Sequence, residues 1–209
     1  MTKPERLLAV VGVAVVASAL LLVMYVRQSN PADAQAAGCA GQRARLGQTL
    51  DQVRFSGSAM HSASMALSDT VRTRNEYLAM VAATRRQLAA THPAAHVLGS
   101  VTRDLADASW ILNDQQTPLQ QAQALLAEDQ RELASATPLI SEASADVRAE
   151  DCPALSLTLA RSGWPKDRLL VELSQAARLN SQVSDKLDVA LELILQAQAD
   201  LHSYSVATK

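Results

Sequence analysis

The chain is poor in the residues that build sheets, tight turns and catalytic loops. It has seven glycines in 209 residues, 3% aromatic residues, and few β-branched residues after position 26. This scarcity argues against a sheet, while abundant Ala, Leu, Gln, Arg and Glu favour helices. No glycine-rich phosphate loop, paired-cysteine zinc motif, His-Glu-x-x-His motif or nucleophile elbow occurs. We therefore expect an all-α protein that is not an enzyme and uses no cofactor or metal.

The chain also lacks a strong net charge. Its formal charge of −2 gives no broad basic field for nucleic acid. A hydrophobic content of 48% against 19% charged residues argues against wholesale disorder. We expect no nucleic-acid partner, and we do not expect a small-molecule ligand.

One long run carries no charge at all, and it comprises residues 7–26. Twenty helical residues span about 30 Å, which matches the apolar core of a bilayer. Lys3 and Arg6 precede the run and favour a cytoplasmic N-terminus. We predict a single-pass inner (plasma) membrane protein with its bulk in the periplasm or an equivalent space. Its expected parts are a cytoplasmic tail at 1–6, a transmembrane anchor at 7–26, a linker at 27–40 and an exported helical bundle at 41–209.

Two other readings of the N-terminal segment compete with the uncleaved anchor. Small residues at 32–36 resemble a signal-peptide cleavage site. Cys39 after Ala37-Gly38 suggests lipid attachment, although a mostly polar linker separates it from the apolar run. The length of the run and the charge of Arg27 before the small residues favour the anchor.

Three later stretches carry mostly apolar residues at heptad spacing without loss of phase. We refer to each set of residues at this spacing as an apolar line. The first line runs from Leu46 to Leu88, the second from Leu98 to Val147, and the third from Leu173 to Tyr204. This spacing predicts an antiparallel, coiled-coil-like bundle of three long helices.

Prolines mark where these helices end or bend. Thr91-His92-Pro93 ends the first, because proline has no N–H and restricts the residue before it. Pro118 and Pro138 kink or break the second helix, and we expect an end-to-end path rather than a chain reversal at Pro118. Residues 149–165, which contain Pro153 and Ser162-Gly163-Trp164-Pro165, are expected to form a loop.

A turn near residues 92–96 would place positions opposite each other when their numbers add to about 191. Cys39 and Cys152 satisfy this, and an oxidising compartment would let them form a disulfide. The same register places Gly57 near Leu133 and Asp129 near His61. Residues 41–92 carry seven Arg against three acids, and residues 94–151 carry ten acids against three Arg. We expect this opposite charge to favour pairing of the two helices.

Several polar residues lie on the apolar lines and are candidates for registry or interaction. Arg74 and Arg85 need partners if buried, and Asp104, Asp107 and Asp114 lie on the facing stretch.

Asp129 and Asn180 interrupt the second and third lines, and Asn180 is expected to specify register. Trp164 is either a cap over the end of the bundle or an anchor for another protein.

Two patterns could indicate a metal or haem site, but a structural role explains each of them better. His92 and His96 have a metal-ligand spacing, but Pro93 lies between them and no third ligand is evident nearby. Met60 beside His61 could ligate haem, but Met60 lies on the first apolar line.

These features predict a non-catalytic, membrane-anchored scaffold or adaptor of an envelope protein assembly. Its expected partners are the membrane, through residues 7–26, and other envelope proteins or further copies of itself. The alternative is a helical binding module, such as a toxin-immunity or ligand-sensing protein. With about six residues before the anchor, such a sensor would have to signal through a partner.

Overall fold

The structure, a computed structural model, describes residues 39–149, 152–164 and 167–207. The predicted tail, the predicted membrane anchor at 7–26 and nearly all of the predicted linker lie outside these residues. No helix among the described residues is both long enough and apolar enough to cross a membrane.

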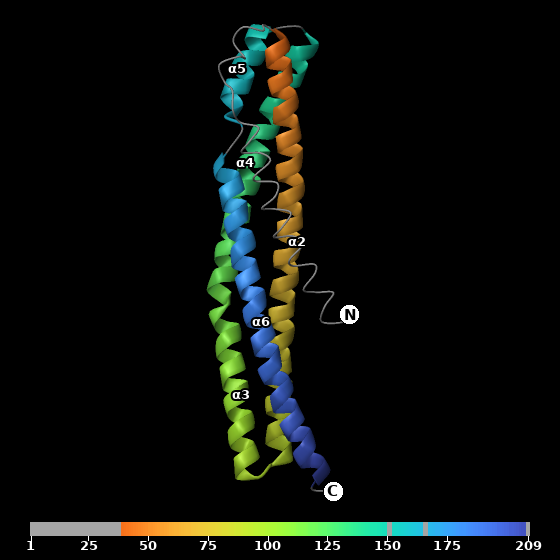
Figure 1. The fold of residues 1–209 in the computed structure, drawn as a ribbon, viewed down its shortest axis with the longest axis vertical. Coiled ribbons are helices and arrows are strands. Elements are labelled where there is room, and N and C mark those ends of the chain that lie inside the picture. Colours follow the sequence, from red (N-terminus) through yellow and green to blue (C-terminus); the bar gives the residue numbers. More distant parts are fainter. Residues whose placement is uncertain (1–38, 150–151, 165–166, 208–209) are drawn as a thin grey trace. The chain divides into compact units, whose positions relative to one another are not determined.

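The described residues form helices joined by short connections and contain no strand, so the predicted all-α class is confirmed. In chain order the helices are α2 (Cys39–Thr91), α3 (Ala95–Asp114), α4 (Gln116–Arg148), α5 (Cys152–Ser162) and α6 (Asp167–Ala207) (Figure 1).

The chain divides into two compact units, and three of the helices contribute to both. The first unit comprises the chain up to Ala63 together with Leu125–Ala177. The second comprises Ser64–Ala124 together with Arg178–Lys209. Each unit brings segments that are distant in sequence into one core.

In the first unit, the start of α2 packs antiparallel to α4, with α5 beside them. Leu46 of α2, Ala136, Ile140 and Ala143 of α4, and Leu155 of α5 form one buried apolar cluster. A Cβ atom built on Gly57 would lie 3.6 Å from Cδ2 of Leu133, so these residues face each other as the fold-back predicted.

In the second unit, α2 packs against α3, and α6 contacts both. The Arg74 side chain reaches the Leu112 carbonyl, and Arg85 reaches that of Leu105, which is the pairing of an antiparallel hairpin. Gln198 Nε2 of α6 donates to Thr84 Oγ1 at 3.1 Å. Ser100 Oγ of α3 donates to Asp200 Oδ2 of α6 at 3.2 Å.

The predicted apolar lines form the interior of both units. Every residue of the second line from Val101 to Val147 is buried or half-buried, and only Leu98 at its start is 45% exposed. The third line is buried or half-buried throughout, and in the first line Arg85 is the exposed position.

On α2 a further line of buried residues runs beside the predicted one, again at multiples of seven. Its members are smaller or more polar: Thr49, Ser56, Tyr77 and Thr84. A helix packed against two neighbours buries a wider stripe than a two-helix seam, so these positions are covered as well.

The predicted loop at 149–165 is wrong, because it contains α5. Pro153 lies in the first turn of α5, where its missing N–H breaks no helical hydrogen bond. Leu155, Thr158 and Ser162 form its buried face. Gly163 ends the helix with φ of +60°, a conformation that glycine adopts without strain.

Pro93, Pro118 and Pro138 have different effects on the path of the chain. α2 ends at Thr91, and His92 then adopts φ of +47° before Pro93. α3 and α4 follow each other end to end with only Gln115 between them, so Pro118 marks a break without a reversal, as expected. Pro138 lies inside α4, which continues past it.

Candidate functional site

The side chain with the most unusual surroundings in the first unit is Asp129 on α4. It occupies an apolar-line position and is fully buried, with 0% of its surface exposed. No N–H or hydroxyl group of the described residues donates to either of its carboxylate oxygens. An ionised carboxylate in such a position is strongly disfavoured, because burial removes its hydration without replacement.

Glu172 of α6 is the acidic neighbour of Asp129, and it is itself buried. Arg168, one turn earlier on α6, donates through Nε to Glu172 and through its terminal nitrogen to Glu128 of α4. The guanidinium therefore links α6 to α4 and neutralises part of the acidic cluster, while Asp129 receives no such bond.

Burial raises the pKa of Asp129 from 3.8 to about 7, helped first by the carboxyl contact with Glu172 and then by the charges of Glu172, Glu132 and Glu128. A carboxyl and a carboxylate in contact can share one proton, with Asp129 donating to Glu172. The arrangement can therefore take up and release a proton near neutral pH.

The proton is the ligand to which this cluster is suited. Among the described residues, no group of three or more His, Cys, Asp or Glu side chains is arranged to hold a metal ion. The expected pair of Asp129 with His61 does not form, because no N–H group donates to either Asp129 oxygen and His61 is exposed. Met60 takes the buried position on α2, at 2% exposure, so the next residue points away from the core.

Arg74 in the second unit bridges the break between α3 and α4. Its Nε donates to the Leu112 carbonyl at 2.6 Å, and its terminal nitrogen reaches Gln116 Oε1 at 3.5 Å. The Leu112 carbonyl lies in the last turn of α3, where carbonyl groups lose their intrahelical donors and the helix dipole is negative. A cation at this point stabilises the helix end and fixes its register against α2.

The expected aspartate partners of Arg74 and Arg85 are replaced by backbone carbonyl groups. Arg85 is exposed and donates to the Leu105 carbonyl at 3.3 Å, a longer contact than that of Arg74. Asp104 instead lies near Asp200, and burial and that charge raise its pKa, while Arg103 lowers it.

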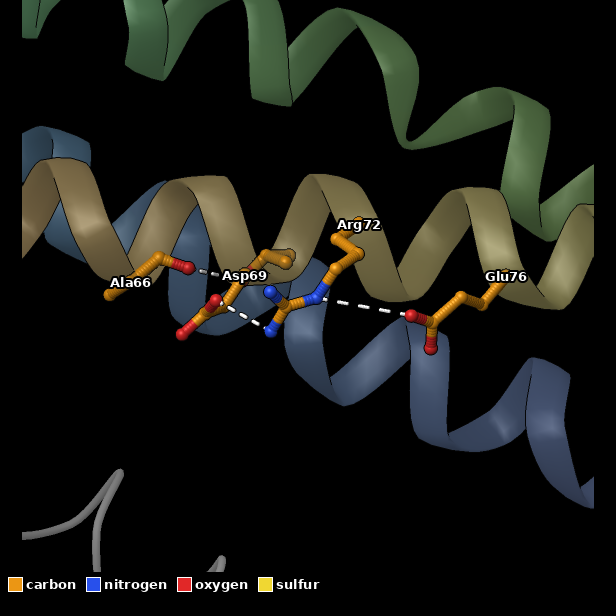
Figure 2. A network of polar contacts seen from close by, with 5 residues as sticks. Ala66, Asp69, Arg72 and Glu76 are labelled. Carbon is orange, nitrogen blue, oxygen red and sulfur yellow. Dashed lines mark hydrogen bonds and ion pairs between the residues drawn. The ribbon is translucent and has the colours of Figure 1, made fainter.

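Two acidic side chains of α4 pair with arginines of α5 and α6. Glu142 pairs with Arg161 of α5 at 2.7 Å, and Glu128 pairs with Arg168 of α6. On α2, Arg72 pairs with Asp69 and Glu76 of the same helix, as Figure 2 shows. Exposed pairs of this kind contribute about 0–1 kcal/mol each.

The remaining candidate residues lie in different places and form no joint site. Trp164 is half-buried and packs against the apolar cluster of the first unit, with its indole N–H buried and without a partner among the described groups. Asn180 is half-buried on α6, and its Oδ1 likewise lacks a described partner.

α2 begins at Cys39 and α5 begins at Cys152. Cys152 is bonded rather than free, and no free cysteine occurs among the described residues. The side chain of Cys39 lies outside the described residues, so the Cys39–Cys152 disulfide stays a prediction.

A residue that heptad reasoning passed over is Trp110 on α3, whose surface is 68% exposed. The sequence already indicated this exposure, because Trp110 lies off the apolar line between Leu105 and Leu112.

Comparison of the chain with protein-family models, with curated proteins and with solved structures finds no match.

Proposed function

We propose that the protein is an exported, non-catalytic scaffold or adaptor, held to the inner membrane by residues 7–26 and acting in an envelope protein assembly. The observation that carries this proposal is the outward face of α3, where the second unit presents the large apolar side chain of Trp110 to solvent. Exposed tryptophan is characteristic of residues that dominate binding at protein interfaces. The uncharged run supplies the membrane attachment.

The exported part is proposed to be a three-helix bundle, built from α2, from α3 with α4, and from α6. The antiparallel contacts within each unit support this arrangement. A disulfide between Cys39 and Cys152 would close a loop of over a hundred residues. By the chain-entropy estimate it would stabilise the fold by on the order of 4–5 kcal/mol.

Two measurements on cells test the location. The protein should resist alkaline extraction from membranes, and added protease should digest it only after the outer barrier is opened. On non-reducing gels the wild type should migrate faster than the Cys152→Ser variant, and reductant should abolish the difference. A soluble protein with free thiols would refute the proposal.

Crosslinking in intact cells, followed by purification of the chain and mass spectrometry, tests the scaffold role. Recovery of several envelope proteins, or of crosslinked copies of the chain, is the expected result. A variant without residues 7–26 serves as the control for membrane attachment. Recovery of a single soluble toxin or enzyme would instead favour the binding-module function, for which the buried Asp129–Glu172 pair would be the first site to examine.

A further inference from the structure

The outward face of α3 has a composition of its own. Val101, Leu105, Ala108 and Leu112 form the buried side of the helix. At about 100° per residue, Trp110 points in the opposite direction, away from this buried line. Its neighbours along the outward face are small or charged and are exposed: Gly99, Arg103, Ala106, Asp107 and Asp114. We refer to these five residues and Trp110 as the α3 outer face.

Trp110 lies between two carboxylates on this face. Asp107 precedes it by three residues and Asp114 follows it by four, spacings that make side chains neighbours on a helix surface. An aromatic ring flanked by carboxylates is suited to a guanidinium group, which stacks on the ring and pairs with the acids.

The same face also carries a guanidinium. Arg103 lies two turns before Trp110, in nearly the same direction from the helix axis, and is exposed. Ala106 lies between Arg103 and Trp110 and has a small side chain. At Gly99, one turn before Arg103, nothing lies within 4 Å of where a Cβ would be. Small residues at such positions allow another helix to approach closely.

We propose that the α3 outer face docks antiparallel on the α3 outer face of a second copy, with Arg103 of each copy stacked on Trp110 of the other. The proposal names one partner for the scaffold proposed above and rests on that function. A two-fold axis beside Ala106 and Asp107 brings both Arg103–Trp110 pairs together at once. It also places each arginine between Asp107 and Asp114 of the opposite copy.

Charge complementarity is the reason for choosing a second copy as the occupant. An interface about a two-fold axis must match itself, so every group that it offers must find its partner on the same face. The α3 outer face offers its ring and its cation this match, because Arg103 of each copy meets Trp110 and the acids of the other at the spacing that antiparallel pairing needs. The two Asp107 side chains meet beside the axis, and each lies next to an Arg103 of the opposite copy. A single helix–helix contact is small compared with stable interfaces, so we expect a weak dimer that depends on concentration.

Sedimentation equilibrium of the purified full-length chain, in a density-matched detergent and over a range of protein-to-detergent ratios, tests the dimer. We expect reversible dimerisation that Trp110→Ala and Arg103→Glu each weaken at least tenfold, while Arg103→Lys weakens it less. Met65→Ala is the matched control, because Met65 is a 55% exposed apolar residue on α2. All these positions are exposed, so circular dichroism should show unchanged helix content in each variant.

A photo-crosslinking residue tests the geometry directly. Placed at Ala106, next to the proposed axis, it should yield a covalent dimer on irradiation. Placed at Val189, a 46% exposed residue of α6, it should not. A monomer at all ratios, or a dimer that is insensitive to Trp110→Ala and Arg103→Glu, would overturn the proposal. Either result would leave the export and crosslinking tests of the scaffold function unaffected, so the two failures are distinguishable.

Discussion

Replacing Asp129 with Asn tests whether the buried acid pair makes stability depend on pH. The change keeps the size of the side chain and removes its ability to ionise. The new amide can donate to Glu172 at every pH, whereas Asp129 can donate only while it is protonated. We expect Asp129→Asn to stabilise the protein above neutral pH and to have little effect in acid.

The expected size follows from the pKa of Asp129, which is 3.8 for the ordinary group and about 7 in the fold. Below pH 3.8 both folded and unfolded chains hold the proton, and this group does not alter stability. Between these values only the folded chain holds it, so stability falls as pH rises. Above about pH 7 the loss is complete and amounts to about 4 kcal/mol, at 1.36 kcal/mol for each pH unit.

Burial, and then the acidic groups around Asp129, determine the sign of this effect. Glu128 and Glu132 on its own helix and Glu172 on α6 all raise its pKa. Arg168 of α6 binds Glu172 and Glu128. At the matching register of α2 the titratable residue is His61, which is exposed.

Urea unfolding followed by circular dichroism at pH 4.5 and pH 8 measures the effect. The gain from Asp129→Asn should be about 1 kcal/mol at pH 4.5, which lies just above the ordinary pKa of 3.8, and should approach 4 kcal/mol at pH 8. Asp51→Asn, at an exposed position of α2 in the same unit, should change stability by less than about 0.5 kcal/mol at both pH values. An equal effect of Asp129→Asn at the two pH values would refute the reasoning.

Four further substitutions test individual contacts by the same unfolding assay. Arg74→Met should cost about 1.5–3 kcal/mol because it removes a charged donor from the Leu112 carbonyl, and Arg85→Met should cost less; equal losses would contradict this. Gly57→Ala should stabilise α2 by about 0.5–1 kcal/mol, since the added Cβ meets Leu133 at an ordinary 3.6 Å. A loss of stability would show that α2 and α4 lie closer together at this point than the contact distance indicates. Pro138→Ala should stabilise α4 by up to about 3 kcal/mol by restoring a helical donor; no gain would show that α4 has adapted to the proline.

The helices and their buried faces could be predicted because heptad spacing is a local property. Positions such as Leu105, Leu112 and Ile194 are fully or almost fully buried because each lies on a line that repeats every seven residues. The antiparallel register of α2 was also predictable, since the short turn at His92 leaves little freedom in where the returning helix pairs.

α5 was missed because its buried face does not consist of apolar residues alone. Thr158 and Ser162 lie on that face beside Leu155, so a count of apolar spacing detects no helix. Pro153 and Gly163 add turn signals at both ends of an eleven-residue element. Here hydrogen bonds replace apolar contact, as Thr158 Oγ1 donates to Asp146 Oδ2 at 3.0 Å.

The acid pair could be predicted only in part, for a related reason. Asp129 stands out as an acid on an apolar line, but Glu172 precedes the predicted start of the third line at Leu173. Pairing across α4 and α6 depends on how many residues the intervening α5 consumes. Heptad spacing therefore identifies which face Asp129 occupies but not the residue opposite it.

Asp129 and Trp110 are opposite departures from one pattern, an acid on an apolar line and a large apolar residue on a polar face. Local departures from an otherwise consistent pattern tend to lie at functional sites, because they persist at a cost to stability. The two residues belong to different units, and the groups that act on Asp129 lie in the first. Effects at independent sites add, so Asp129→Asn should change stability without changing dimerisation. Trp110→Ala should do the reverse, and a dimer that weakens when Asp129 is neutralised would show that the proton site and the α3 outer face are coupled.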